Sequence, residues 1–270
     1  MTVPDGDARR PMGIRLAVLG SGSAGNATCI EGGGTRILLD AGFSCRELVA
    51  RLRAVGVDPR RIDALAITHE HADHVRGAAL FSKTYRVPIH CTERTARAAS
   101  LDRQGAYARV PIEPGVAFAI GALALVPFPV PHDAVETVGY VVSCDEGRVG
   151  YATDLGHAPE EARRALRGCD LLILESNHDV DLLRSGPYPE VVKQRVLGRH
   201  GHLDNETAAE VMCEVASERT TRIVLAHLSR TNNRPDLALL AARRSFESAG
   251  RRPPRLHPAE QGTPSPWFEA

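Results

Sequence analysis

The stretch Thr68-His69-Glu70-His71-Ala72-Asp73-His74 decides how this sequence is interpreted. It follows a short apolar run, which predicts a buried strand that ends in a polar loop. Four of its side chains, all within six residues, are of kinds that bind metals: His69, His71, Asp73 and His74. If the strand end stays extended, His69, His71 and Asp73 alternate onto one face, and a turn brings His74 round to join them. Imidazole and carboxylate groups at this density predict a site for zinc, manganese or iron rather than calcium.

Three further metal-binding candidates follow predicted strands later in the chain: His132, Asp154 and His227. Taken alone, each has an ordinary alternative. His132 and His227 could be structural histidines at strand ends, and Asp154 could cap a turn before Gly156. Their placement favours a site, because loops at strand ends are where α/β proteins collect functional residues.

The composition is that of an ordinary globular chain. Of the 270 residues, 43% are hydrophobic and 24% are charged, which excludes a disordered protein and allows one large domain. Basic and acidic residues both number 33, so net charge indicates neither a nucleic acid nor a membrane as partner. All basic residues except Lys83 and Lys193 are arginines, which suits phosphate contacts but equally reflects a general arginine bias.

Cysteine usage and hydropathy indicate a compartment. The six cysteines include no C-x-x-C pair, which favours reduced, mostly buried thiols over a disulfide framework. The start lacks a signal-peptide pattern, and Gly121, Pro127 and Pro129 interrupt the longest apolar stretch, Val116–Pro131. We therefore expect a cytoplasmic protein with no membrane partner.

The remaining patterns outline one domain between two tails. Residues 1–11 predict a disordered N-terminal tail, the Pro-rich residues 251–270 predict a C-terminal tail, and residues 12–250 predict a single domain. Turn residues predict three hairpins, at 32–34, at 121 and at 145–147. Helical spacing of apolar residues predicts helices at 44–55, 159–167, 205–217 and 235–248. We expect two packed sheets with helices outside.

The H-x-H-x-D-H motif resembles the signature of the metallo-β-lactamase superfamily, and the later candidates follow in that superfamily's order. The resemblance spans residues 14–248 and implies an α+β fold, a four-layer αββα sandwich of mixed sheets with helices on the outer faces. It also implies two divalent metal ions, Zn or Mn. The first ion would be held by His69, His71 and His132, the second by Asp73, His74 and His227, with Asp154 bridging the two.

Finer motifs resemble the bacterial YycJ/WalJ-like branch, whose members are exonucleases acting on double-stranded DNA or phosphodiesterases. They are the loop Gly20–Asn26, the segment Glu175–Asp179, the segment Gly198–Asn205, and His227–Ser229 with Asn232 and Asn233 after it. Asp204 stands where this branch usually has serine, but either residue can cap the helix predicted to follow. Asp154 stands where many secreted zinc β-lactamases carry a cysteine, which also favours the nuclease branches.

Together these features predict a metal-dependent hydrolase that cleaves phosphodiester bonds and needs no organic cofactor. The expected nucleophile is a hydroxide that bridges the two ions, oriented by Asp73. His202 precedes a predicted helix N-terminus, where anions are favoured, so we expect it to bind the phosphate or protonate the leaving oxygen. A structural role for His202 stays the alternative, and the roles of His178 and of the loop Ser21–Asn26 stay open.

The sequence is compatible with more than one substrate. DNA is the leading expectation, and the alternatives are a small cyclic phosphodiester, a thioester, or a non-catalytic metal-binding regulatory module. A basic rim around the metals would favour DNA. Its candidates are Arg76, Arg94, Arg97, Arg195 and Arg199. The sequence does not indicate the metal, the polarity of digestion or the oligomeric state.

Overall fold

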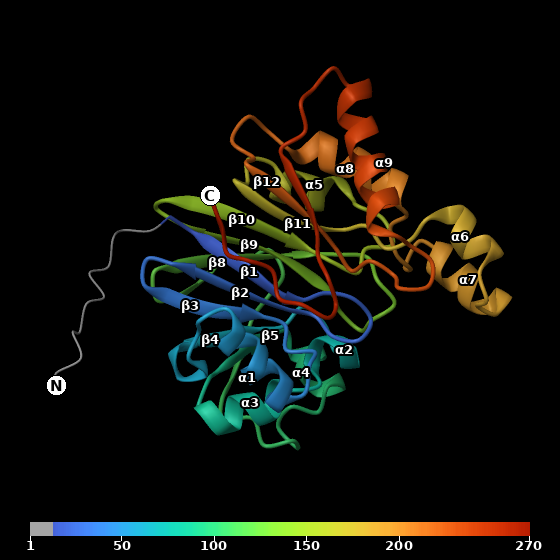
Figure 1. Ribbon diagram of the computed structural model, residues 1–270. Coiled ribbons are helices and arrows are strands. Elements are labelled where there is room, and N and C mark those ends of the chain that lie inside the picture. The colour runs from blue at the N-terminus through green and yellow to red at the C-terminus, as the bar shows by residue number, and fades with distance from the viewer. Residues whose placement is uncertain (1–12) are drawn as a thin grey trace.

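The computed structural model describes residues 13–270, so the tail predicted for residues 1–11 lies outside the described part of the chain. Two seven-stranded sheets in the described part pack face to face, and helices cover both outer faces (Figure 1). This arrangement confirms the four-layer αββα sandwich expected from the sequence. Within the same residues, each helix is too short or too polar to traverse a lipid bilayer.

The first sheet has the strand order β14-β1-β2-β3-β4-β5-β6. Its strands are β1 (Arg15–Gly20), β2 (Ala27–Gly32), β3 (Thr35–Leu39), β4 (Ala64–Ala66), β5 (Ile89–Cys91), β6 (Arg109–Pro111) and β14 (Phe268–Glu269). Gly33 and Gly34 turn the β2–β3 hairpin with φ of 56° and 81°, a conformation that favours glycine. From β3 to β6 the strands run parallel, so each needs a crossover connection to the next.

The second sheet has the order β13-β12-β11-β10-β9-β8-β7. Its strands are β7 (Phe118–Ile120), β8 (Leu123–Pro129), β9 (Val138–Cys144), β10 (Gly147–Ala152), β11 (Leu171–Glu175), β12 (Arg222–Ala226) and β13 (Arg255–Pro258). Strands β7 to β10 form an antiparallel meander, and β10 to β13 are parallel. The three predicted hairpins are all present, between β2 and β3, β7 and β8, and β9 and β10.

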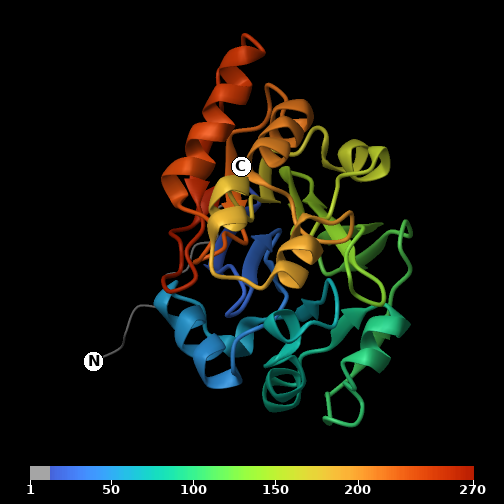
Figure 2. The same cartoon turned by 90° about the vertical axis from the view of Figure 1, so that its right-hand side faces the viewer.

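Helices of the first half pack on the first sheet, and helices of the second half pack on the second. The former are α1 (Cys45–Ala54), the 3-10 helix η1 (Pro59–Arg61), α2 (Ala72–Val75), α3 (Ala78–Tyr85) and α4 (Glu93–Ala98). The latter are α5 (Glu160–Leu166), α6 (Val180–Ser185), α7 (Glu190–Leu197), α8 (Asn205–Val215) and α9 (Pro235–Ser248). The predicted helix boundaries hold to within two residues for α1, α5, α8 and α9. Helices α6 and α7 lie to the side of the other helices, at the right of Figure 1, and Figure 2, viewed from that side, shows them in amber in front of the sheets.

Three apolar clusters account for this layering. One fills the space between the sheets, with Tyr140, Tyr151 and Ile173 among its members. The other two lie between each sheet and its own helices. Strand β11 is buried along its full length, as expected of a parallel strand covered on both faces. Loops at the strand ends are thereby fixed by rigid elements, which is what a functional site requires.

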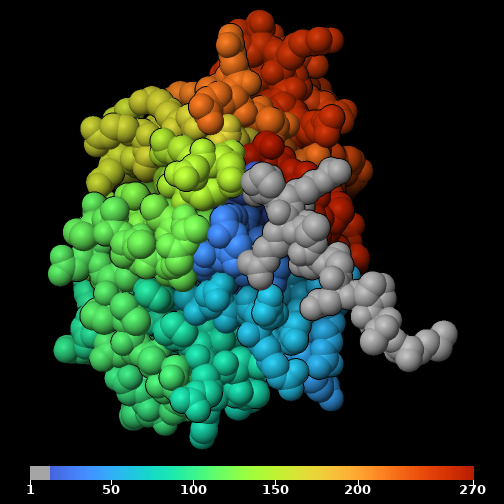
Figure 3. Space-filling view, turned by 90° about the vertical axis from the view of Figure 1, so that its left-hand side faces the viewer, coloured from blue at the N-terminus to red at the C-terminus, as the bar shows by residue number. Residues whose placement is uncertain are grey.

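The tail predicted for residues 251–270 is wrong. Strand β13 extends the second sheet beside β12, and β14 extends the first sheet beside β1. In the space-filling view of Figure 3, red C-terminal residues border the blue residues of the first strands. The Pro-rich pattern was misleading because proline is tolerated on edge strands, and Pro258 ends the edge strand β13.

Candidate metal centre

The histidine-rich stretch lies where β4 ends and the short helix α2 begins. His71 is the N-cap of α2, so Asp73 and His74 lie in a helical turn. The expectation of an extended strand with His69, His71 and Asp73 on one face is therefore wrong. The turn is held by backbone bonds, because the N–H groups of Asn26 and Ala41 donate to the carbonyls of Asp73 and His74 at 2.7 Å each.

The structure brings His69, His71 and His132 together. Each offers one ring nitrogen, and these three atoms lie within 4.8 Å of one another. Ring centroids are separated by 4.7 Å for His69 and His71, and by 5.1 to 5.2 Å from these rings to His132. Nδ1 of His132 lies 3.2 Å from the carbonyl oxygen of Gly201, which leaves Nε2 for the centre. This group matches the set expected for the first ion.

A second group joins Asp73, His74 and His227, again with ligand atoms within 4.8 Å. Oδ2 of Asp73 lies 3.7 Å from Nε2 of His74 and 3.5 Å from Nε2 of His227. Burial raises the pKa of Asp73, but the neighbouring His227 and the charge of His74 hold it below its usual range. This group matches the set expected for the second ion.

Asp154 lies between the two groups and is almost completely buried. Its Oδ2 is 3.1 Å from Nε2 of His74, and its Oδ1 is 3.7 Å from Nε2 of His132. Burial raises the pKa of Asp154, but the nearby His227 and His74 hold it well below its usual range. Asp154 and His227 also have positive φ, 61° and 54°, a strained conformation that concentrates at functional sites.

Unpartnered buried atoms indicate that these residues fit divalent cations. Among residues 13–270, Nε2 of His69, Nε2 of His227 and Oδ2 of Asp154 are buried without a hydrogen-bond partner. Such groups are rare in folded proteins and require an explanation. Burial holds the pKa of His69 well below its usual value, so the ring is in the neutral form that binds metals.

Two buried residues that the sequence analysis did not single out contact the Nδ1 atoms of the candidate histidine ligands. Oδ2 of Asp40 lies 2.8 Å from Nδ1 of His74, and Oδ1 accepts from the backbone N–H of Thr68 at 2.8 Å. The Thr68 hydroxyl in turn lies 3.0 Å from Nδ1 of His69. Partners of this kind fix the orientation of ligating imidazoles.

Glu175, the last residue of β11, connects His202 to the centre. Its Oε1 lies 2.8 Å from Nδ1 of His202 and 3.0 Å from Nδ1 of His227. Burial raises the pKa of Glu175, but His202 and His227 lower it to about 2. Burial lowers the pKa of His202, but the neighbouring Glu175 raises it above its usual value. The His202 ring centroid is 5.2 Å from those of His132 and His227, so His202 borders the centre.

The loop Ser21–Asn26 also contacts the centre. Nδ2 of Asn26 lies 3.0 Å from Nε2 of His74, and the Ser21 hydroxyl accepts from the N–H of His227 at 2.8 Å. Asp204 caps α8 by accepting from the backbone N–H groups of Glu206 and Thr207 at 3.0 Å each, as the sequence predicts. His178 is buried and belongs to none of the described groups that could hold a metal.

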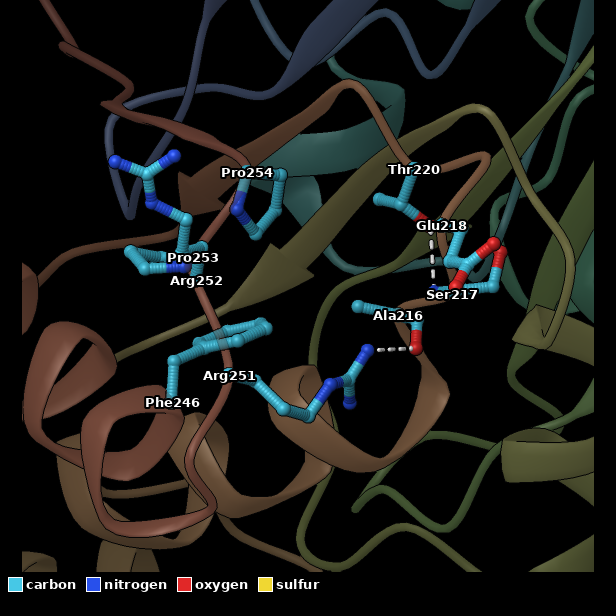
Figure 4. A pocket seen from close by; sticks show the side chains of 9 residues that line it. All are labelled: Ala216, Ser217, Glu218, Thr220, Phe246, Arg251, Arg252, Pro253 and Pro254. Atoms are coloured by element: carbon cyan, nitrogen blue, oxygen red, sulfur yellow. Dashed lines mark hydrogen bonds between the residues drawn. The ribbon is translucent and has the colours of Figure 1, made fainter.

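The arginines proposed as a rim have different surroundings. Arg94 and Arg97 pair with glutamates close to them in the chain or fold. Arg195 pairs with Asp133, and both line a cavity of about 140 Å³ beside His202. A cavity of about 280 Å³ lies apart from the candidate centre, next to the end of α9, where Arg251 donates to the carbonyl oxygen of Ala216 (Figure 4).

Known proteins with similar sequences or folds belong to the family that the motifs resemble. Residues 35–228 match the model of the β-lactamase superfamily domain. The chain is 31% identical over 245 residues to the exodeoxyribonuclease YycJ of Bacillus anthracis, covering 88% of this chain and 91% of the relative. It is 34% identical over 231 residues to the exodeoxyribonuclease WalJ of Streptococcus pneumoniae, covering 84% and 86%. The metallo-β-lactamase-fold protein YhfI of Bacillus subtilis superposes with a TM-score of 0.72 at 17% identity, over 94% of this chain and 99% of that one.

Proposed function

Because the chain belongs to the metallo-β-lactamase-fold hydrolase superfamily, in its YycJ/WalJ-like branch, we propose that it is a DNA exonuclease. The family and the histidine clusters support the broader statement that it is a metal-dependent phosphodiesterase. One observation carries the proposal: candidate ligands from separate segments converge beside a histidine, His202, that is itself held by a buried carboxylate. The activity on DNA is inferred from relatives that are named exodeoxyribonucleases.

We propose two ions, Zn²⁺ or Mn²⁺, held in the sets expected from the sequence. His69, His71 and His132 would hold one, Asp73, His74 and His227 would hold the other, and Asp154, which lies between the two groups, would be shared. When bound, ions of this kind lower the pKa of water and neutralise charge on phosphate oxygens. Nitrogen and carboxylate donors suit both metals, and imidazole favours zinc.

The other residues divide the remaining work. In hydrolysis the oxygen of water bonds to phosphorus, the P–O bond to the leaving nucleoside breaks, and the leaving oxygen gains a proton. Asp73, whose Oδ2 lies 3.7 Å from Nε2 of His74 and 3.5 Å from Nε2 of His227, orients the attacking water. Glu175 engages Nδ1 of His202, so Nε2 is the atom that donates a hydrogen bond or a proton to the leaving oxygen.

The same proposal includes a compartment. The six cysteines of the chain are free in the structure, and four of them are buried. A protein that keeps its thiols free fits the reducing cytoplasm, which is where we place this one.

The experiment that tests the function uses the metal-reconstituted protein. Duplex DNA labelled at the 5′ or the 3′ end is incubated with it beside bis(p-nitrophenyl) phosphate. We expect stepwise shortening of the DNA, and an Asp154→Ala variant should lose it together with its metal. Cleavage of the small ester without DNA would instead indicate a hydrolase of small phosphodiesters. If the protein binds metal but cleaves neither substrate, it is a non-catalytic metal-binding module.

A further inference from the structure

A small cavity next to the candidate metal centre has no place in the function described so far. Six residues line it: Asp133, Val192, Arg195, Val196, Gly201 and His202. Its volume is about 140 Å³. Pockets for drug-sized ligands measure roughly 300–1,000 Å³, so this one has room for a piece of a larger substrate.

His202 is the wall that the cavity shares with the centre. Its ring lies 5.2 Å, between centroids, from the rings of His132 and His227, and it also lines the cavity. A leaving oxygen that accepts a proton from His202 therefore has the cavity as its neighbour. The group attached to that oxygen is the part of the substrate that enters the cavity.

The floor of the cavity is tied to the centre as well. The carbonyl oxygen of Gly201 lies 3.2 Å from Nδ1 of His132. A Cβ atom at Gly201 would collide with the backbone oxygens of Arg195 and Val196, so only glycine allows α7 to approach this closely. The cavity and the ligand His132 are thus held in a fixed relation.

The cavity walls offer apolar contact and hydrogen-bond donors. Val192 and Val196 are four residues apart on α7, which places them on one face of the helix. Arg195 donates through Nε to Asp133, which neutralises a carboxylate that would otherwise repel a phosphate ester. Among residues 13–270 no hydrogen bond engages the two Nη groups of Arg195, which leaves them available to oxygens of a ligand.

We infer that this cavity is the subsite for the nucleoside on the leaving side of the scissile phosphate. The sugar and base contact Val192 and Val196, and the free Nη groups of Arg195 donate to their oxygens. This inference rests on the proposed phosphodiesterase function. It names the substrate class of that site, a nucleoside ester rather than an ester of a small alcohol.

The test compares two variants of α7, a helix without a buried residue, so that substitutions there leave the fold intact. The double variant Val192→Gln/Val196→Gln makes the cavity wall polar. Val191→Gln is the matched control, because Val191 is 82% exposed and does not line the cavity. The substrates are thymidylyl-(3′→5′)-thymidine and the methyl ester of thymidine 5′-monophosphate, which differ in the leaving group.

We expect the double variant to lower the ratio of kcat/KM for the dinucleotide to that for the methyl ester by roughly tenfold, the effect of small changes in an apolar pocket. The control variant should keep the ratio of the parent. Thymidine, the released nucleoside, should bind the metal-loaded parent and the control in saturation-transfer NMR, and should bind the double variant more weakly.

The outcomes separate this inference from the function on which it rests. If the parent cleaves phosphodiesters but the double variant keeps both the ratio and the thymidine signal, the inference alone is overturned. A parent that binds metal but cleaves neither DNA nor either small ester overturns the proposed function and the inference with it.

Discussion

Oδ2 of Asp40 lies 2.8 Å from Nδ1 of His74, and neither side chain is exposed to solvent. The contact fixes the ring so that Nε2 points toward Asp154. Removing such a partner of a ligating histidine typically costs about 10- to 100-fold in metal affinity or activity. We therefore expect Asp40→Asn to weaken divalent metal binding by roughly that factor, measured by competition with a chromophoric chelator.

A stability measurement separates this effect from general unfolding. Asp181→Asn, at an exposed position on α6, is the matched control and should bind metal like the parent. If Asp40→Asn remains folded in urea titration and still binds metal with the parent's affinity, Asp40 does not position His74.

His202→Ala should keep its metal content and lose turnover. The side chain is not in the two ligand sets proposed above, although it forms a further group with Asp154, Glu175 and His227 whose ligand atoms lie within 4.8 Å of one another. Its Nδ1 lies 2.8 Å from Oε1 of Glu175. General acid–base groups contribute about 10²- to 10⁴-fold, so we expect kcat on labelled duplex DNA, whose leaving alkoxide needs a proton, to fall within that range. His157→Ala is the control, since His157 bonds through Nδ1 to the Arg199 carbonyl and borders neither ion group.

Metal content measured on both variants makes the result decisive. If His202→Ala loses metal in proportion to activity, its role is to hold the ions. If it retains both metal and turnover, His202 takes no part in the chemistry.

The side chains that the structure brings together could be selected from the sequence where they are close in the chain or follow an apolar strand. The spacing of His69 to His74 is short enough that any compact local structure brings these side chains together, even though the local structure is the helix α2 and not an extended strand. His132, Asp154 and His227 were found because each follows a strand, and their strands lie in the same sheet.

The supporting carboxylates could not be assigned from sequence in the same way. Asp40 and Glu175 both stand at the ends of buried strands, a signal that marks them as candidates. Their roles depend on which histidine each one meets, and those partners are 34 and 27 residues away for His74 and His202. The first contact depends on the pairing of β3 with β4, and the second on the loop between α7 and α8, where the Leu203 N–H also donates to Glu175.

Thiol reactivity tests the burial of the cysteines. Burial raises the pKa of Cys29 and Cys91 to about 12 and that of Cys169 to about 11, so almost none of these groups is thiolate at pH 8. Cys45 and Cys144 are only partly buried. We expect iodoacetamide to modify Cys45 and Cys144 first, and Cys29, Cys91 and Cys169 only in urea, as located by peptide mass spectrometry. Rapid modification of Cys29 in the native protein would contradict the packing of the first sheet.

Phe268 shows why the C-terminal residues are part of the fold. It belongs to β14 of the first sheet, yet its ring lies 4.8 Å from that of His257 and 4.2 Å from the guanidinium carbon of Arg222, both in the second sheet. The side chain is buried among residues between the two sheets. Because truncating a buried phenylalanine costs about 3–5 kcal/mol, Phe268→Ala should lower the free energy of unfolding in urea by about 3 kcal/mol. Val191→Ala on the exposed face of α7 is the control and should change it by less than about 0.5 kcal/mol. An equally small effect at Phe268 would mean that β14 does not hold the two sheets together in solution.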